Sequence, residues 1–247
     1  MTILNNDADV RRIREAGAIV RELLNILGEK AKAGVSTAAL DAFSEDFILR
    51  NGGEPAFKGY KGYPSTICAS VNEVVVHGIP SEDKVLEDGD IISVDVGVKK
   101  NGYYADAART FPVGNISDEA QRLVRVTEEC LREAVNEAVA GNRLYDVSNA
   151  VQKIAEREGF EEVRAFVGHG IGVRLHEPPE VPNWGQKGKG QVLEEGLLLA
   201  IEPMINQGKR EVEILEDGWT AVTADRKLSA HFENTVMVGI NKTEILT

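Results

Sequence analysis

Two aspartates in residues 91–110 stand where they can hold a cation. The runs IISVDVGVKK and YYADAART flank Asn101-Gly102, which strongly favours a two-residue hairpin loop, because a type I′ turn needs positive φ at both central residues. This register sets Gly97 opposite Asp106, so Asp95 and Asp106 become diagonal neighbours on one face. Diagonal partners lie roughly 7–8 Å apart. Two carboxylates at that separation can share one cation or hold two side by side.

The alternative is that Asp95 and Asp106 are solvated residues on the open face of a hairpin. The run IISVDV around Asp95 has almost no polar alternation, which is typical of a strand buried on both faces. A buried carboxylate requires a partner or a metal. The pattern therefore favours the metal interpretation.

Further candidates lie in the second half of the chain. His169 stands in the glycine-rich run FVGHGIG, Glu202 ends the apolar run LLLAIE, and Glu233 lies inside SAHFENT. Each alone fits a capped turn or a satisfied polar group, and the glycines of FVGHGIG only weakly favour phosphate binding because no helix pattern follows. Jointly, one histidine and four carboxylates form a hard, oxygen-rich ligand set that suits Mn²⁺, Fe²⁺, Co²⁺ or Zn²⁺.

The elements that must position these residues alternate between helices and strands. Apolar spacing and end signals predict four helices and several short strands. The expected helices are Asp7–Lys32, a second one capped by Ser36 or Thr37 and closed by Gly52-Gly53, Ser117–Ala140 and Leu144–Glu158; the expected strands are Ile67–Val71, Val74–His77, the Ile91–Phe111 hairpin and further strands from Val163 onward. The order is helix, helix, strands, and then the same again.

The same recurrence is visible in the residues themselves. Val85–Asp95 aligns without a gap with Val192–Glu202, so that Asp95 falls on Glu202, and His77-Gly-Ile recurs as His169-Gly-Ile. An acid that falls on an acid at the end of a buried strand favours an internal duplication. We expect one catalytic domain, residues 1–247, built from two pseudo-symmetric halves of about 1–115 and 116–247. Facing halves would bring both acidic strands to a central site.

Composition restricts the class of protein. The chain has 247 residues, 43% of them hydrophobic and 28% charged, with a net charge of −12. These values are ordinary for a globular enzyme and argue against binding to DNA or to anionic membranes. Two cysteines, Cys68 and Cys130, are too few for a disulfide scaffold and suit a reducing cytoplasm. The N-terminal stretch has no apolar signal region.

The ordered motifs VDVG…ADAART, FVGHGIG…LHE, AIEP and SAHFENT resemble those of type I methionine aminopeptidases, over essentially the whole chain. The resemblance implies the α/β pita-bread fold, in which two pseudo-symmetric helix-helix-strand halves surround a curved antiparallel sheet. The short interval between His169 and Glu202 lacks the helical insert of type II enzymes. The expected activity is removal of the N-terminal methionine from nascent proteins whose second residue is small and uncharged.

The same resemblance implies a role for each metal ligand. Asp95 would be a bidentate ligand of one metal, Asp106 and Glu233 would bridge two metals, and His169 and Glu202 would complete the other. Two adjacent dications (Co, Mn, Fe or Zn) would generate a hydroxide that attacks the scissile carbonyl, and would anchor the substrate α-amine. Glu202 is also the candidate proton shuttle.

Residues outside the metal set also match family positions. His77 and His176 would hydrogen-bond the substrate amide and the tetrahedral intermediate, whereas His231 is expected to be structural. The implied methionine pocket consists of Phe57, Tyr60, Tyr63, Cys68, Leu175 and Trp219, of which Phe57 and Leu175 occupy positions that vary in the family. Asn72, Val74 and Ser229 match positions that hold a monovalent cation, Na⁺ or K⁺. The chain's own Met1-Thr2 satisfies the small-residue rule.

Two rival interpretations share the fold. Proline dipeptidases cleave Xaa-Pro bonds and normally carry an added N-terminal domain, for which we expect no room here. Non-catalytic pita-bread domains bind histones or RNA and have lost their ligands, whereas all five ligands are present here. We expect a cytoplasmic monomer that acts on nascent N-termini, with Lys99-Lys100 and Lys187-Lys189 available for transient contact with the ribosome.

Overall fold

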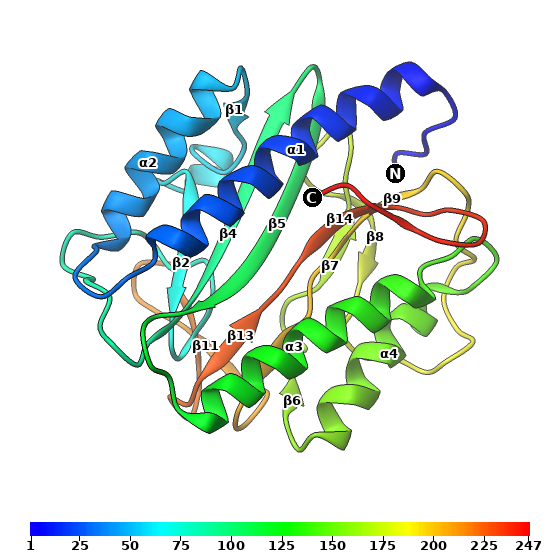
Figure 1. Cartoon of the computed structure of the whole chain (residues 1–247). Helices are drawn as coiled ribbons and strands as arrows, with labels where there is room; N and C mark the ends of the chain where they lie inside the picture. Colours follow the sequence, from blue (N-terminus) through cyan, green and yellow to red (C-terminus); the bar gives the residue numbers. More distant parts are fainter.

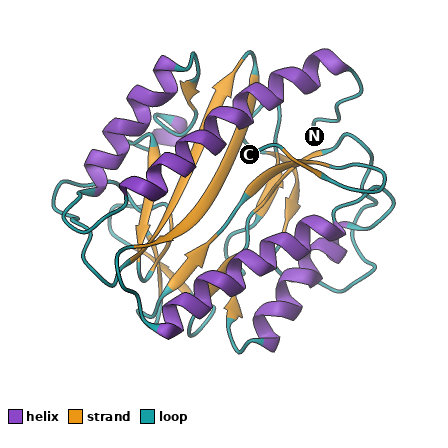
Figure 2. Cartoon of the chain, in the orientation of Figure 1, coloured by secondary structure: helices purple, strands orange, loops and turns teal.

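A computed structural model describes all residues, 1–247, and has a mixed α/β architecture. Four helices lie on one side of the strands (Figures 1 and 2). They are α1 (Asp7–Lys30), α2 (Thr37–Arg50), α3 (Asp118–Glu137) and α4 (Leu144–Arg157). The predicted order of two helices followed by strands, repeated once, is confirmed.

The strands pair only antiparallel, as expected, but they form four hydrogen-bonded sheets rather than one. The sheet orders are β1-β4-β2 with β5 on β4, β13-β10-β6, β11-β12-β3, and β15-β14-β9-β7-β8. The strands are β1 (Glu54–Pro55), β2 (Ile67–Val71), β3 (Val74–Val76), β4 (Ile91–Lys100), β5 (Tyr103–Pro112), β6 (Glu161–Glu162), β7 (Gly168–Gly170), β8 (Glu177–Val181), β9 (Leu198–Ile201), β10 (Met204–Asn206), β11 (Val212–Ile214), β12 (Ala221–Thr223), β13 (Ser229–His231), β14 (Asn234–Met237) and β15 (Glu244–Ile245), with one short 3₁₀ turn at Tyr60–Gly62.

The helix ends follow from local capping chemistry. The side chains of Asn6, Ser36 and Ser117 each accept a hydrogen bond from a backbone N–H of the first helical turn. The third helix was predicted to reach Ala140, but it ends at Glu137. The reason is tertiary, because the N–H of Ala140 donates to the carbonyl of Gly239 and therefore leaves the helical pattern.

The β4–β5 hairpin has the predicted register. Gly97 pairs with Asp106, which makes Asp95 and Asp106 diagonal neighbours. Asn101 and Gly102 both have positive φ, as a type I′ turn requires. The alternation of buried side chains along β4 is almost absent, since nearly every residue from Ile91 to Val98 is buried.

The fold has two large hydrophobic cores, one that includes the buried faces of α1 and α2 and one that includes those of α3 and α4. Equivalent contacts recur in the two halves: Ser36, the N-cap of α2, pairs with Val85, and Arg143, the N-cap of α4, pairs with Val192. Val85 and Val192 are the first residues of the repeat found in the sequence. We therefore propose that the chain arose by internal duplication. No helix combines the length and apolarity that a membrane span requires.

Candidate metal centre and substrate cavity

One cavity of about 170 Å³ collects the residues that the sequence singles out. Its lining is Phe57, Tyr60, Lys61, Tyr63, Cys68, His77, Asp95, Asp106, His169, Leu175, His176, Glu202, Trp219 and Glu233. This set contains all five predicted metal ligands, both predicted substrate-binding histidines and all six predicted pocket residues. Lys61 is the one lining residue that the sequence interpretation left unassigned.

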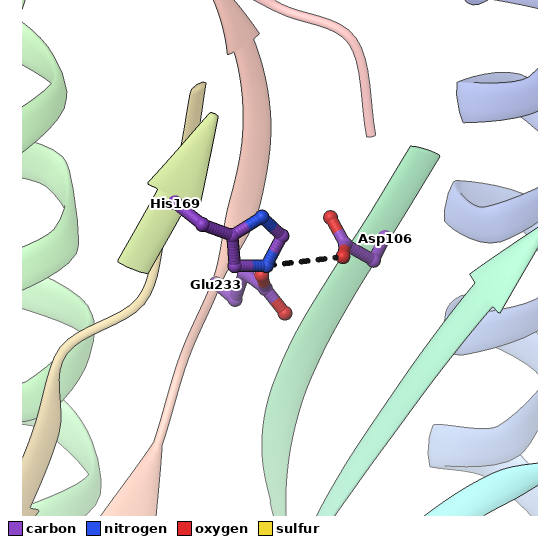
Figure 3. Close-up of side chains that lie close together, drawn as sticks. All are labelled: Asp106, His169 and Glu233. Atoms are coloured by element: carbon purple, nitrogen blue, oxygen red, sulfur yellow. Dashed lines mark ion pairs between the residues drawn. The ribbon is translucent and has the colours of Figure 1, made fainter. Parts of the chain in front are cut away.

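The centre of the cavity is formed by Asp106, His169 and Glu233. One ligand atom from each lies within 4.8 Å of those of the other two. Asp106 comes from β5, His169 from β7, and Glu233 from the two-residue connection between β13 and β14 (Figure 3). Nε2 of His169 is 3.6 Å from Oδ2 of Asp106. Strands from both halves therefore supply the trio.

Asp95 and Glu202 extend the trio into a five-residue group. Glu202 directly follows β9, and its Oε1 is 3.7 Å from Nε2 of His169. Asp95 lies on β4, and its Oδ1 is buried without any hydrogen-bond partner. An unpartnered buried carboxylate oxygen is costly unless a cation faces it.

Burial and mutual repulsion shift the acids toward their protonated forms. Burial, and then Asp106, raise the pKa of Asp95, and burial raises the pKa of Asp106 to about 6. Burial and the neighbouring carboxylates also raise the pKa values of Glu202 and Glu233. Four such carboxylates can all be charged only if cations neutralise them, so the residues present fit a site for divalent metals.

The imidazole of His169 is prepared to act as a neutral ligand. Burial lowers its pKa to about 4. Its Nδ1 lies 2.9 Å from the carbonyl of Gly170 and must donate to it, which leaves the Nε2 lone pair directed at Asp106 and Glu202. This is the usual arrangement of a histidine that binds a metal through Nε2.

Thr235 is a supporting residue that the sequence interpretation missed. Its Oγ1 lies 3.0 Å from Oδ1 and 2.8 Å from the carbonyl of Asp106, and the N–H of Asp106 donates to it at 3.0 Å. The hydroxyl thus orients Asp106 where β5 and β14 meet. It closes the motif SAHFENT, two residues after Glu233, and this position is the sequence signal that could have identified it.

The two predicted histidines outside the metal group both line the cavity, each against an aromatic ring. Nδ1 of His176 is 3.0 Å from the hydroxyl of Tyr60, with the two rings stacked at 5.1 Å. Desolvation, and then His169, lower the pKa of His176 to about 4. The ring of His77 meets Phe166 edge-on at 5.4 Å, and burial lowers its pKa. Both imidazoles are therefore neutral at physiological pH.

The predicted methionine pocket is an aromatic wall beside the acids. Tyr63 meets Trp219 edge-on at 5.1 Å, and its hydroxyl lies 3.0 Å from the carbonyl oxygens of both Ile67 and Gly78, either of which can accept its one hydrogen. Cys68 pairs with Asp95 in the register of β2 and β4, and burial and then Asp95 raise the pKa of its thiol. A Cβ at Gly97 would lie only 2.5 Å from the Phe57 ring, so the close approach of Phe57 requires glycine.

The residues predicted for a monovalent cation lie together, outside the cavity. The N–H of Ser229 donates to the carbonyl of Asn72 at 2.9 Å. Asn72 has φ of 55°, and its side chain bonds Asp90 and the N–H of Ile91. Val74 begins β3 two residues later.

Comparison with known proteins agrees with this geometry. The model of metallopeptidase family M24 matches residues 11–239. A methionine aminopeptidase of Clostridium perfringens is 52% identical over 247 residues, which cover 100% of this chain and 99% of that protein. The chain belongs to metallopeptidase family M24.

Within family M24, the similarity is to methionine aminopeptidases. The crystal structure of the Thermotoga maritima methionine aminopeptidase superposes with a TM-score of 0.97 at 42% identity, covering 100% of this chain and 99% of that one. The expected pita-bread α/β fold is thereby confirmed. Prolidase from Pyrococcus furiosus matches with a TM-score of 0.78 at 23% identity, and the chain covers 65% of it. That likeness shows the shared fold alone.

His231, for which the sequence predicts only a structural role, lies near the group of five proposed metal ligands. His231 is buried, as expected for a structural residue, but its Nε2 lacks a hydrogen-bond partner and lies 3.7 Å from Oε2 of Glu202. Glu202 therefore stands between two imidazoles, those of His169 and His231.

Proposed function

We infer that this chain is a methionine aminopeptidase, a metal-dependent hydrolase that removes the N-terminal methionine from polypeptides. The observation that carries this proposal is the convergence of five potential ligands from both halves on one small cavity. Membership of family M24 gives the reaction class, and the methionine aminopeptidases among its relatives give the substrate.

We propose that the five ligands hold two divalent cations. Asp95 would bind one, His169 and Glu202 the other, and Asp106 and Glu233 would lie between them. Cations held there supply Lewis-acid chemistry, since they acidify water and polarise a carbonyl. Co, Mn, Fe and Zn all suit the donor set, and the metal used in the cell depends on supply.

The residues around the ligands would bind and orient the substrate. The methionine side chain would occupy the pocket of Tyr63, Cys68, Trp219 and their neighbours, where aromatic edges suit a polarizable thioether. His176, held by Tyr60, would donate from Nε2 to the carbonyl oxygen as charge develops there. Glu202, between His169 and His231, is the carboxylate best placed to accept a proton and pass it to the leaving amine.

Finer points follow from the same proposal. The enzyme would act on the N-termini of nascent chains, as a monomer, with the lysines at 99, 100, 187 and 189 available to the ribosome. A reducing cytoplasm suits its two free, buried cysteines. Asn72, Val74 and Ser229 would hold one Na⁺ or K⁺.

Hydrolysis of Met-Ala-Ser by the metal-loaded protein tests the function. We expect release of free methionine, abolished by chelation and restored by Mn²⁺, Fe²⁺ or Co²⁺. An Xaa-Pro dipeptide serves as the contrasting substrate, because cleavage of that peptide alone would favour a prolidase. A protein that neither binds divalent metal nor releases methionine would overturn the proposal.

A further inference from the structure

Glu177 is a buried carboxylate to which the proposed mechanism gives no task. It is the first residue of β8, and its side chain is only 1% exposed. It directly follows Leu175 and His176, two residues of the cavity wall. A carboxylate at this depth needs strong hydrogen-bond donors.

The donors come from the start of the chain and from the loop itself. The hydroxyl of Thr2 lies 2.8 Å and 3.0 Å from the two carboxylate oxygens of Glu177, and the Met1 nitrogen lies 2.9 Å from Oε2. The N–H of Arg174 donates to Oε1 at 2.9 Å. One carboxylate thus joins two segments that are far apart in sequence.

Thr2 is a firm anchor because its backbone is paired with β9, the strand that Glu202 directly follows. The N–H of Leu198, in β9, donates to the carbonyl of Thr2 at 3.1 Å. Ile3 pairs with Leu197, and the N–H of Leu4 donates to the carbonyl of Gly196 at 2.9 Å. The N-terminal segment is therefore fixed to the same rigid element that positions a proposed metal ligand.

The loop packs closely on this anchor. The N–H of Val173 donates to the Thr2 hydroxyl at 3.4 Å. Gly172 has φ of 152°, and a Cβ there would lie 2.5 Å from the Thr2 side chain. The single hydroxyl of Thr2 thus accepts from the loop backbone and donates to Glu177, so it is bonded at both ends.

We propose that Thr2 and Glu177 are positioning residues for catalysis: together they fix the loop Gly172–Glu177 so that Leu175 and His176 face the cavity. The consequence for the reaction rests on the proposed function. The hydrogen-bonded link between Thr2 and Glu177, which we call the clamp, does not depend on that function, since its hydrogen bonds can be tested by amide exchange.

The test compares Thr2→Val, which keeps the shape and removes the hydroxyl, with Thr2→Ser, which keeps the hydroxyl. Intact mass defines the N-terminus of each full-length, metal-loaded protein. In T2V we expect the backbone amides of Val173 and Arg174 to exchange with deuterium about ten-fold faster than in wild type. In T2S we expect the exchange rates of the same amides to stay near those of wild type. The matched control is Thr243→Val, which loses a buried bond to the Ala138 carbonyl elsewhere. Unchanged exchange in T2V would overturn the clamp.

Kinetics on Met-Ala-Ser test the positioning role. We expect kcat of T2V to fall about three- to ten-fold, the usual effect of one lost hydrogen bond, with T2S close to wild type. In a His176→Ala background, T2V should cause no further loss of kcat, because the positioned imidazole is gone and Leu175, the other positioned residue, only lines the methionine pocket. A full additional loss in that background, or an unchanged kcat beside faster exchange, would refute positioning. Inactive wild-type protein would refute the proposed function and leave the exchange result standing.

Discussion

His169 and Asp106 face each other across the boundary between the two halves, with Nε2 of one 3.6 Å from Oδ2 of the other (Figure 3). Because the histidine is neutral, this contact is not an ion pair. It brings together two atoms that could bind the same metal ion. Their position explains why neither half can form the site alone. The interface between the halves is therefore both the centre of the fold and the proposed centre of the chemistry.

Asp106→Asn should remove the central acid with little change of shape. Because Asp106 is proposed to bridge two cations, we expect kcat on Met-Ala-Ser to fall at least about 100-fold, the upper range for changes around metal ligands. Metal content after dialysis should fall in parallel. The matched control is Asp146→Asn, another buried aspartate, which caps α4 by accepting from the N–H of Arg143. Equal metal content in both variants would count against Asp106 as a ligand.

Chelation should destabilise the protein because buried, mutually repelling carboxylates lose their counter-charge. At free metal 100-fold above Kd, bound metal stabilises the fold by about 2.7 kcal/mol. For a chain of this size that corresponds to roughly 5–10 °C in Tm. Thermal unfolding with EDTA and after re-addition of Mn²⁺ measures the effect. In Asp106→Asn the metal-dependent increment should shrink; a wild-type Tm indifferent to both additions would argue against a metal site.

The hairpin shows what could be predicted from sequence. Asn101-Gly102 determines the turn, the turn determines the register, and the register places Asp95 beside Asp106. These are short-range effects that local sequence controls. The convergence of His169 and Glu233 on them was implied by the family resemblance and by the repeat, not by any local rule.

Long-range packing accounts for what the sequence could not provide. The end of α3 depends on a bond from Ala140 to Gly239, and the clamp at Glu177 depends on Thr2. In both cases the two partners are about a hundred residues or more apart, and no local pattern in the sequence pairs one with the other. In the sequence, Met1-Thr2 stands out only as a possible substrate, whereas in the structure the Thr2 hydroxyl bonds Glu177.

Tyr60→Phe removes the hydroxyl that bonds Nδ1 of His176 but keeps the stacked ring. With Nδ1 unpartnered, His176 loses the contact that selects its tautomer and orientation. We expect kcat to fall roughly two- to ten-fold, with a smaller change in KM. Steady-state kinetics on Met-Ala-Ser measure this, and Tyr145→Phe on α4 is the control. An effect confined to KM would mean that Tyr60 only lines the pocket.

Glu177 should make stability dependent on pH. Burial opposes its charge, but hydrogen bonds from the Met1 amine, Thr2 and the Arg174 N–H outweigh burial and lower its pKa below the ordinary 4.5. A lowered pKa contributes stability that is fully present above pH 4.5 and is lost as pH falls through the folded-state value. Urea unfolding of wild type and Glu177→Gln should therefore differ by a constant amount from pH 7 to pH 5 and converge below pH 4.5. Glu180→Gln, exposed on the same strand, should show no such convergence.

Replacing Trp219 tests whether the aromatic wall of the pocket recognises the sulfur of methionine. Its ring meets Tyr63 edge-on at 5.1 Å in the cavity wall, and sulfur–aromatic contacts contribute about 0.3–1.5 kcal/mol. In Trp219→Leu we expect kcat/KM for Met-Ala-Ser to fall roughly two- to ten-fold relative to a norleucine analogue, in which a methylene replaces the sulfur. Trp184→Leu changes the only other tryptophan, which is 43% exposed and outside the cavity, and should leave the ratio unchanged. Equal losses for both peptides in Trp219→Leu would show that Trp219 provides shape and not recognition of the thioether.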